Sequence, residues 1–176
     1  MITLREISRE DLPTINRWRR DPVVAAGVGA PRRFIGLDVD VRWYEDYLGR
    51  RGSEVRCAVC LADSGQLVGM VSLTGVDQVH RSAEFHVMIG ETEWQGRGVG
   101  TAAATAMVRH GFFDLNLHRI YVTVLRDNKS SIRMCEKAGF RLEGTIREAA
   151  FKDGRYHDLV LMGVLASEIL GDGGAR

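Results

Sequence analysis

The sequence predicts one α/β domain in which about four helices flank a mixed, mostly antiparallel sheet of about seven strands. Three observations support this fold class. Residues 2–7 alternate apolar and polar side chains, as a half-buried strand does. Further strand-like runs follow one another between residues 54 and 89, and apolar residues at helical spacing occur before and after them. With 176 residues, of which 45% are hydrophobic, the chain can bury one core but has no room for a second.

The region after the first strand predicts two helices separated by a loop. A helix is expected over residues 9–20, where Ile15 and Trp18 belong to an apolar series at helical spacing. Residues 21–38 contain glycines, two prolines and small side chains, which predict a mobile connection. Residues 41–48 again carry apolar side chains at helical spacing and are followed by glycines, so a second helix is expected there.

Three consecutive strands are predicted over residues 54–62, 66–76 and 80–89. The segments between them, at residues 63–65 and near 77–78, are short and have the polar, glycine-containing composition of hairpin turns. We therefore expect an antiparallel meander.

The rest of the chain alternates between helical and extended patterns. The expected elements are a helix over residues 99–114, a strand over 119–125, a helix over 128–138, and strands over 140–151 and 156–165 joined at Asp153-Gly154. The single domain is expected to span residues 1–165, and residues 166–176 form a short tail that we expect to be frayed from about Gly171.

Charge and hydropathy exclude two classes of partner. The 24 basic and 23 acidic residues give a formal net charge of +1 and are scattered along the chain, which argues against nucleic-acid binding. No segment approaches the roughly 18 apolar residues of a membrane helix, and the N-terminus lacks an apolar signal region. We expect a soluble, cytoplasmic protein, either a monomer or a homodimer, without nucleic-acid or membrane partners.

Cys57 and Cys60 form a Cys-x-x-Cys pattern that could indicate zinc or redox chemistry. Both lie in a predicted strand, where residues three apart point to opposite faces, so the two sulfur atoms would diverge. The sequence also lacks further cysteine and histidine ligands at the spacing of a zinc site. We predict no metal site and reduced thiols, as in a cytosolic protein.

The most informative segment is the glycine-rich run at residues 94–101, which lies between a predicted strand and a predicted helix. Glycines at 96, 98 and 100 allow the backbone to curl with its amide groups pointing inward, and the helix dipole adds to their attraction for phosphate. The run lacks the Gly-Lys-Ser/Thr ending of a Walker A loop and a clearly placed acidic residue for a ribose. It therefore predicts a diphosphate site for another kind of ligand.

The spacing of Gln95, Gly98 and Gly100 resembles the Gln/Arg-x-x-Gly-x-Gly/Ala loop of the GCN5-related N-acetyltransferase (GNAT) superfamily. A second segment, Asn-Lys-Ser-Ser-Ile-Arg-Met-Cys-Glu-Lys-Ala-Gly-Phe at residues 128–140, resembles the later Asn-x-x-Ser helix of that superfamily. Its Glu-Lys-x-Gly-Phe ending is similar to the ribosomal-protein acetyltransferase (RimJ/RimL)-like branch. The resemblance extends from Ile2 to about Leu165 and implies the GNAT fold.

The resemblance implies that the chain uses acetyl-CoA as a cosubstrate and transfers its acetyl group to a primary amine. In such proteins the glycine loop holds the pyrophosphate, and a strand backbone together with the Asn of the later helix holds the pantetheine arm. The residues implied to bind the coenzyme are Val87, Met88, Ile89, Gln95, Gly96, Arg97, Gly98, Val99, Gly100, Thr101, Asn128 and Ser131. By its position before a helix, Asn128 is also a candidate N-cap.

Acyl transfer to an amine requires a base for the amine and protonation of the departing thiolate. Glu84, His86 and Met88 share one face of their strand. Glu84 matches the glutamate of an Ala-Glu-x-Gly pattern in the resembling branch and is the first candidate base. His86 replaces the glycine of that pattern, and an imidazole with a pKa of about 6.5 is suited to the same task. The structural alternatives are that Glu84 forms an ion pair at the end of the strand and that His86 packs on the sheet.

The tyrosine that many relatives use as the acid has no counterpart in residues 128–140. Candidates for protonating the thiolate are therefore Ser131, its neighbour Ser130, Cys135 or water, and Cys135 is equally a candidate core residue. Asp158 is expected to be structural. Direct attack in a ternary complex is expected because the sequence offers no well-supported nucleophile for an acyl-enzyme.

The acceptor stays open among protein N-termini, polyamines, aminoglycosides and amino sugars. Trp18, Arg19, Trp43 and Tyr44 lie in segments expected to flank the acceptor, where arginine and aromatic rings would suit a phosphate-bearing or cyclic amine. Burial in the core is the alternative for the aromatic residues. Rival functions are a sensor that binds acyl-CoA without turnover and a structural partner with an inactive loop.

Overall fold

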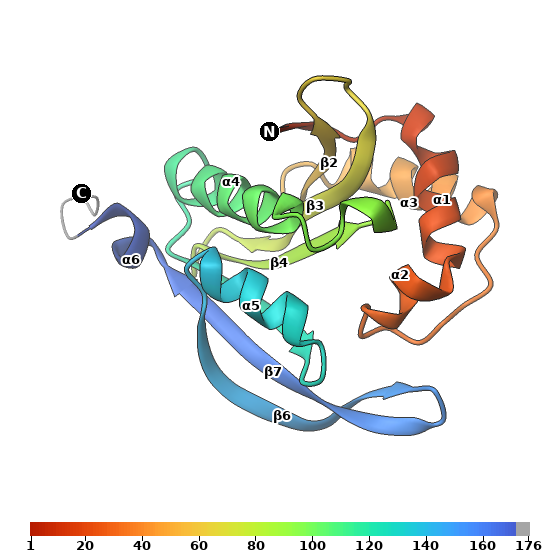
Figure 1. Cartoon of the computed structure of the whole chain (residues 1–176). Helices are drawn as coiled ribbons and strands as arrows, with labels where there is room; N and C mark the ends of the chain where they lie inside the picture. Colours follow the sequence, from red (N-terminus) through yellow and green to blue (C-terminus); the bar gives the residue numbers. More distant parts are fainter. Residues whose placement is uncertain (172–176) are drawn as a thin grey trace.

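The computed structural model describes residues 1–171, and all seven predicted strands join one sheet in the order β1-β2-β3-β4-β5-β7-β6 (Figure 1). Neighbouring strands are antiparallel except for the parallel pair β4 and β5, so the mixed, mostly antiparallel sheet is confirmed. The strands are β1 Ile2–Glu6, β2 Val55–Leu61, β3 Leu67–Asp77, β4 Ser82–Ile89, β5 Arg119–Leu125, β6 Arg141–Lys152 and β7 Arg155–Leu165.

The helices cover both faces of this sheet. Within the described residues they are α1 Leu12–Arg20, α2 Pro22–Ala26, α3 Leu37–Gly49, α4 Val99–Phe113, α5 Lys129–Lys137 and α6 Ala166–Leu170, with single 3-10 turns at Arg9–Asp11 and Thr92–Trp94. The four longer α-helices agree with the prediction to within a few residues at each end. The two five-residue helices, α2 and α6, were not expected.

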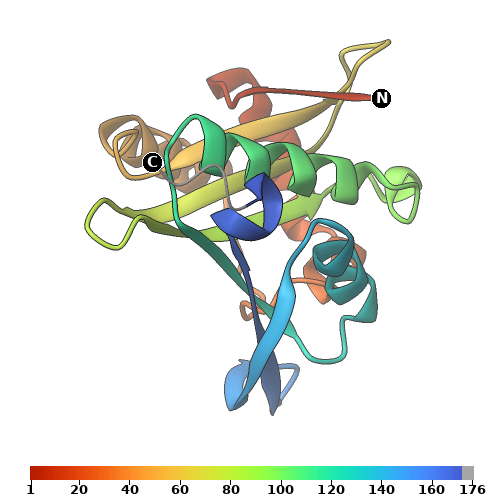
Figure 2. The same cartoon turned by 90° about the vertical axis from the view of Figure 1, so that its left-hand side faces the viewer.

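One apolar core lies between the sheet and α4, which runs along one sheet face in both views (Figures 1 and 2). Phe85, Met107 and Ile120 are fully buried there. The other face is covered by α1 and α3, where Trp18 packs in a second cluster with Met70 and Met88. The alternation of β4 explains the division, because its odd-numbered residues face α4 and its even-numbered residues face the other way.

Strands β4 and β5 pair over only three residues each and then separate. Their register runs from Ser82 with Arg119 to Glu84 with Tyr121. Beyond this point β4 continues to pair with β3, and β5 continues to pair with β7. The edge of β4 that is directed toward β5 is therefore not paired with β5 from Phe85 onward.

Two regions differ from the sequence-based expectation. The connection predicted over residues 21–38 contains α2, because the Asp21 carboxylate accepts hydrogen bonds from Val23 N at 2.7 Å and Val24 N at 3.4 Å and Pro22 fills the first helical position. The third helix then begins at Leu37 rather than at 41. Residues 166–170 of the predicted tail form α6, and residues 172–176 lie outside the part that is described.

Cys57 and Cys60 point to opposite faces of the sheet, as predicted. Cys57 packs toward the α4 core and Cys60 toward the opposite cluster, and all three cysteines are free. Residues 1–171 contain no group of three side chains arranged to bind a metal ion. Among the described helices, none is long and apolar enough to cross a membrane.

Candidate active site

The glycine loop before α4 has the geometry of an anion site. Gly96 and Gly98 adopt left-handed backbone angles, with φ of 73° and 84°, and Gly98 is the N-cap of the 15-residue helix. The first-turn amides at Val99, Gly100 and Thr101 have no intrahelical partners, and no side chain caps this helix. Open N–H groups at the positive end of a long helix favour a negatively charged phosphate.

A cleft of about 530 Å³ joins this loop to the start of α5 and the free edge of β4, and we call it the coenzyme cleft. It brings together the two motifs, which are about 30 residues apart in the sequence. Ten of the twelve predicted coenzyme residues line it, namely Val87, Met88, Ile89, Gln95, Gly96, Gly98, Gly100, Thr101, Asn128 and Ser131.

The remaining two predicted residues lie beside the cleft. Val99 is buried in the core, so it can contribute only its backbone amide. The Arg97 guanidinium stacks over the ring of Trp94, with 5.3 Å between the guanidinium carbon and the ring centroid. The cleft instead contains two cations that were not assigned a role, Arg133 and Lys137. Their spacing of four residues, which places both on one face of α5, could have indicated in the sequence that they act together.

Asn128 and Gln95 fasten the walls of the coenzyme cleft. The Asn128 side-chain oxygen accepts a hydrogen bond from Ser131 N at 3.1 Å, which confirms the predicted N-cap. The Asn128 Nδ2 atom donates to the carbonyl oxygen of Gly27 at 3.0 Å, at the end of α2. Gln95 Nε2 donates to the carbonyl oxygen of Ile89 at 2.8 Å and so holds the glycine loop against the end of β4.

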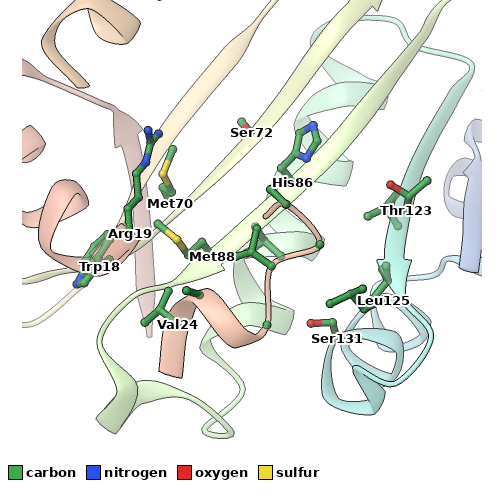
Figure 3. A pocket seen from close by; sticks show the side chains of 18 of the residues that line it. Trp18, Arg19, Val24, Met70, Ser72, His86, Met88, Thr123, Leu125 and Ser131 are labelled. Carbon is green, nitrogen blue, oxygen red and sulfur yellow. The ribbon is translucent and has the colours of Figure 1, made fainter. Parts of the chain in front are cut away.

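A second cavity of about 560 Å³, the acceptor cavity, lies beside the coenzyme cleft between α1, α2, β4 and β5 (Figure 3). The two share wall residues, including Val87, Met88 and Ser131. Trp18, Arg19 and Trp43 line the acceptor cavity as expected, whereas Tyr44 does not. Because Met88 and Ser131 belong to both walls, a thioester in the cleft and an amine in the cavity could meet there.

His86 is the titratable side chain of β4 that lines the acceptor cavity. Its Nε2 atom lies 2.9 Å from Thr74 Oγ1 and 3.7 Å from Glu84 Oε2. Partial removal from water is the main cause that lowers the pKa of His86 below the usual imidazole range, and the Glu84 carboxylate opposes this shift. The imidazole is therefore neutral at pH 7 and able to accept a proton.

Glu84 occupies a different position from the one expected of a first-choice base. Its side chain is half-buried beside β5, where Thr123 Oγ1 lies 3.5 Å from Oε1, and it is not part of the cavity wall. Two residues of the cavity wall contact it, Thr123 at 3.5 Å and His86 at 3.7 Å. Glu84 is thus placed to adjust the charge of the imidazole rather than to touch an amine in the cavity.

Two candidates for protonating the thiolate, Ser131 and Cys135, occupy different positions. Ser131 lies at the junction of the two cavities, where its hydroxyl can donate a hydrogen bond. Cys135 contributes to the cavity wall from a fully buried position, and burial raises the pKa of its thiol to about 12. Cys135 also does not line the coenzyme cleft, whereas Ser131 lines both cavities. The geometry favours a core role for Cys135.

Asp158 is structural, as expected. It accepts a hydrogen bond from Glu148 N at 3.0 Å and pairs with Arg126 Nη1 at 3.0 Å. These partners lower the pKa of its carboxyl group. They hold the bulged middle of β6 to the end of β5.

Comparison with known proteins agrees with this arrangement. A family model described as an acetyltransferase (GNAT) domain matches residues 1–141. The spermidine N(1)-acetyltransferase of Escherichia coli K12 is 30% identical over 182 residues, which cover 97% of this chain and 89% of the relative. A putative ribosomal N-acetyltransferase of Bacillus subtilis is 34% identical over 130 residues, covering 74% of this chain and 68% of the relative.

Among solved structures, the spermidine N-acetyltransferase of Vibrio cholerae in complex with CoA and spermine superimposes with a TM-score of 0.89 at 30% identity. The match covers 97% of this chain and 98% of that one. The comparisons include both spermidine and ribosomal-type acetyltransferases, so the narrower RimJ/RimL-like placement is not confirmed.

Proposed function

Since this chain belongs to the GNAT family and is an acetyl-CoA-dependent N-acetyltransferase, we propose that it acetylates a small primary amine bound in the acceptor cavity. The observation that carries this proposal is the junction of the two cavities at Met88 and Ser131, with His86 on the acceptor side. The amine attacks directly, because the cysteine of the cavity wall is buried and its pKa is raised.

The residues present fit acetyl-CoA. The open amides of the glycine loop and first turn of α4 would hold the pyrophosphate, and Arg133 and Lys137 would add positive charge on the opposite wall. The unpaired edge of β4 at Val87 and Met88 would bind the pantetheine amides as an added strand does. Acetyl-CoA supplies a thioester whose carbonyl carbon accepts the amine nitrogen.

We assign the proton acceptor to His86. Its neutral imidazole can take a proton from an ammonium or amine in the cavity, directly or through one water molecule. Thr74 Oγ1 orients the ring, and the Glu84 carboxylate stabilises the imidazolium that forms. Glu84, the first candidate from sequence, becomes a positioning residue that acts through His86.

We assign protonation of the thiolate to Ser131 or to water at the same junction. A free amide of β4 beside Met88 would donate to the thioester oxygen as negative charge develops on it. Asn128 supports both substrates, since it caps the helix that carries Ser131 and holds the end of α2 over the cavity.

Similarity alone makes a polyamine the first acceptor to test, because relatives over most of the chain are named spermidine acetyltransferases. The relatives give less support to a protein N-terminus as the acceptor than to a polyamine. A relative named as an L-amino acid N-acetyltransferase, 30% identical over 125 residues, adds amino acids to the set.

The test is release of free CoA thiol from acetyl-CoA with a panel of polyamines, amino acids, amino sugars, aminoglycosides and peptides. We expect amine-dependent release with at least one small amine and none with long peptides. Tight binding of CoA by calorimetry, combined with no release for any amine, would contradict the proposal and indicate a sensor. Release that requires a peptide N-terminus would contradict the small-amine assignment alone.

A further inference from the structure

We infer that the acceptor is an amine that also carries an oxyanion group, a carboxylate or a phosphate, which binds the arginines of the acceptor cavity. This inference rests on the proposed function and specifies its substrate class. It differs from what the names of the spermidine acetyltransferase relatives would suggest, because spermidine carries only positive charges at neutral pH.

The wall of the acceptor cavity carries positively charged side chains. Four arginines line the acceptor cavity, and no aspartate or glutamate among residues 1–171 does so. They come from α1, from the connection between α2 and α3, and from β2. Their numbers are Arg19, Arg32, Arg33 and Arg56.

Arg19 and Arg56 both pack against one aromatic ring, that of Trp43. Their guanidinium carbons lie 4.6 Å and 4.9 Å from the centroid of Trp43. Behind them, Arg19 Nη1 pairs with Asp40 Oδ1 at 2.6 Å, and Arg56 Nη2 pairs with Glu54 Oε2 at 2.6 Å. Both carboxylates are buried outside the cavity. They fix the side chains and leave further N–H groups of each guanidinium free, since a guanidinium has five donors.

Arg32 and Arg33 add charge that is not neutralised. Both are exposed, and within the described part of the chain neither makes an ion pair or a side-chain hydrogen bond. The buried amine of Lys152 lies under the same connection, where it donates to the carbonyl oxygens of Ala25, Ala26 and Val28 at 2.6–2.9 Å. Lys152 thus adds a buried positive charge beside α2, and the Asp21 carboxylate at the other end of α2 is bound to the amides of Val23 and Val24.

The carboxylates near these arginines do not cancel the positive charge of the cavity wall. Asp40 and Glu54 are each bound to one of the arginines, and Glu84 lies at the other end of the cavity beside His86. A polyamine would therefore meet unpaired guanidinium groups and no free carboxylate on the arginine side. A carboxylate or phosphate would instead receive paired N–H donors in the planar geometry that both oxyanions prefer.

Position links the arginines to the reaction. Figure 3 shows Arg19 on α1 to one side of His86 and Thr123 on β5 to the other. An acceptor could place its oxyanion near Arg19 while its amine lies near His86 and the junction with the coenzyme cleft. The cavity volume of about 560 Å³ is that of a small-molecule site.

The experiment measures binding to the protein saturated with CoA, by calorimetry, so that turnover is not required. Two matched pairs are compared, glucosamine 6-phosphate with glucosamine, and an L-amino acid with its carboxamide, and spermidine is titrated alone. We expect the oxyanion member of at least one pair to bind at least about tenfold more tightly, corresponding to one charge-assisted contact. The pair that responds distinguishes phosphate from carboxylate.

Variants locate the effect. Arg32→Gln and Arg33→Gln are exposed changes that should not affect folding, and we expect either or both to weaken oxyanion binding by up to about tenfold. Arg109→Gln, an exposed arginine on α4, is the matched control and should change nothing. Equal binding within both pairs, or tight spermidine binding that strengthens in the arginine variants, would overturn the inference. Amine-dependent thiol release measured in parallel would still support the proposed function in that case, and its absence with every amine would end both.

Discussion

The side-chain amide of Asn128 joins the two halves of the candidate site, donating to the carbonyl oxygen of Gly27 at 3.0 Å across 101 positions of sequence. Its oxygen simultaneously caps α5 through Ser131 N. One residue thus holds the helix of the coenzyme cleft and the end of α2 beside the acceptor cavity. A shift of α5 in the coenzyme cleft can therefore move the end of α2, and so affect binding in the acceptor cavity.

Replacing Asn128 separates these two contacts. Asn128→Asp keeps the cap but loses the donor to Gly27, so we expect near-normal stability and a higher KM for the acceptor. Asn128→Ala loses both, and we expect it to be about 1 kcal/mol less stable in urea unfolding. Identical acceptor KM values for Asn128→Asp and the unaltered protein would show that the Gly27 contact has no part in the site.

His86 and Glu84 predict different kinetic effects. His86→Gln should lower kcat by about 10²-fold or more, because a general base is lost, with little change in the KM for acetyl-CoA. Glu84→Gln should have a smaller effect on kcat. A larger loss of kcat in Glu84→Gln than in His86→Gln would return the base to Glu84.

The pH dependence follows from the direction of the His86 shift. The rate should rise with pH as the imidazole loses its proton, and the midpoint should lie below the usual imidazole range, since burial lowers the pKa of His86. The Glu84 carboxylate raises that pKa, so Glu84→Gln should move the midpoint to still lower pH. An unshifted midpoint in this variant would mean that the two side chains are not coupled.

Two glycines of the loop should respond differently to alanine. Gly98 has a φ of 84°, so Gly98→Ala should cost about 1 kcal/mol of stability as well as coenzyme affinity. A Cβ atom on Gly100 would meet Ile89 Cγ1 and Met134 Cγ at an ordinary 3.6 Å. Gly100→Ala should therefore keep its stability and still raise the KM for acetyl-CoA, because the added methyl group enters the cleft. An unchanged KM in Gly100→Ala would argue against phosphate approach at this position.

Lys152 predicts a stability effect that is transmitted to the acceptor cavity. Its buried amine donates to three carbonyl oxygens after α2, and Lys152→Met leaves them without that donor. We expect a loss of about 2 kcal/mol in urea unfolding and weaker acceptor binding. Lys129→Met is the matched control, since the exposed Lys129 donates to one carbonyl oxygen only, and should be nearly neutral.

The elements of the site could be predicted from the sequence because each depends on local rules. The strand alternation of residues 82–89, the glycines before α4 and the asparagine cap of α5 are each visible within one short segment. The helix α2 was missed although Asp21-Pro22 is a helix-start signal, because the glycines and prolines of residues 21–38 indicated a loop more strongly.

The choice between Glu84 and His86 could not be made from the pattern. The two share a strand face but lie about 6.6 Å apart along it, and the point where β5 separates from β4 decides which one faces the cavity. The arginine group was beyond the sequence for a similar reason. Only the fold brings Arg19, Arg32, Arg33 and Arg56 together from three separate segments.

A crystal structure of the protein with CoA tests the proposed site most directly. The joined cavities predict that the pyrophosphate lies on the amides of residues 98–101 and that the sulfur atom lies at the junction formed by Met88 and Ser131, facing His86. A coenzyme bound outside this cleft, or a sulfur atom on the far side of β4 from His86, would contradict it.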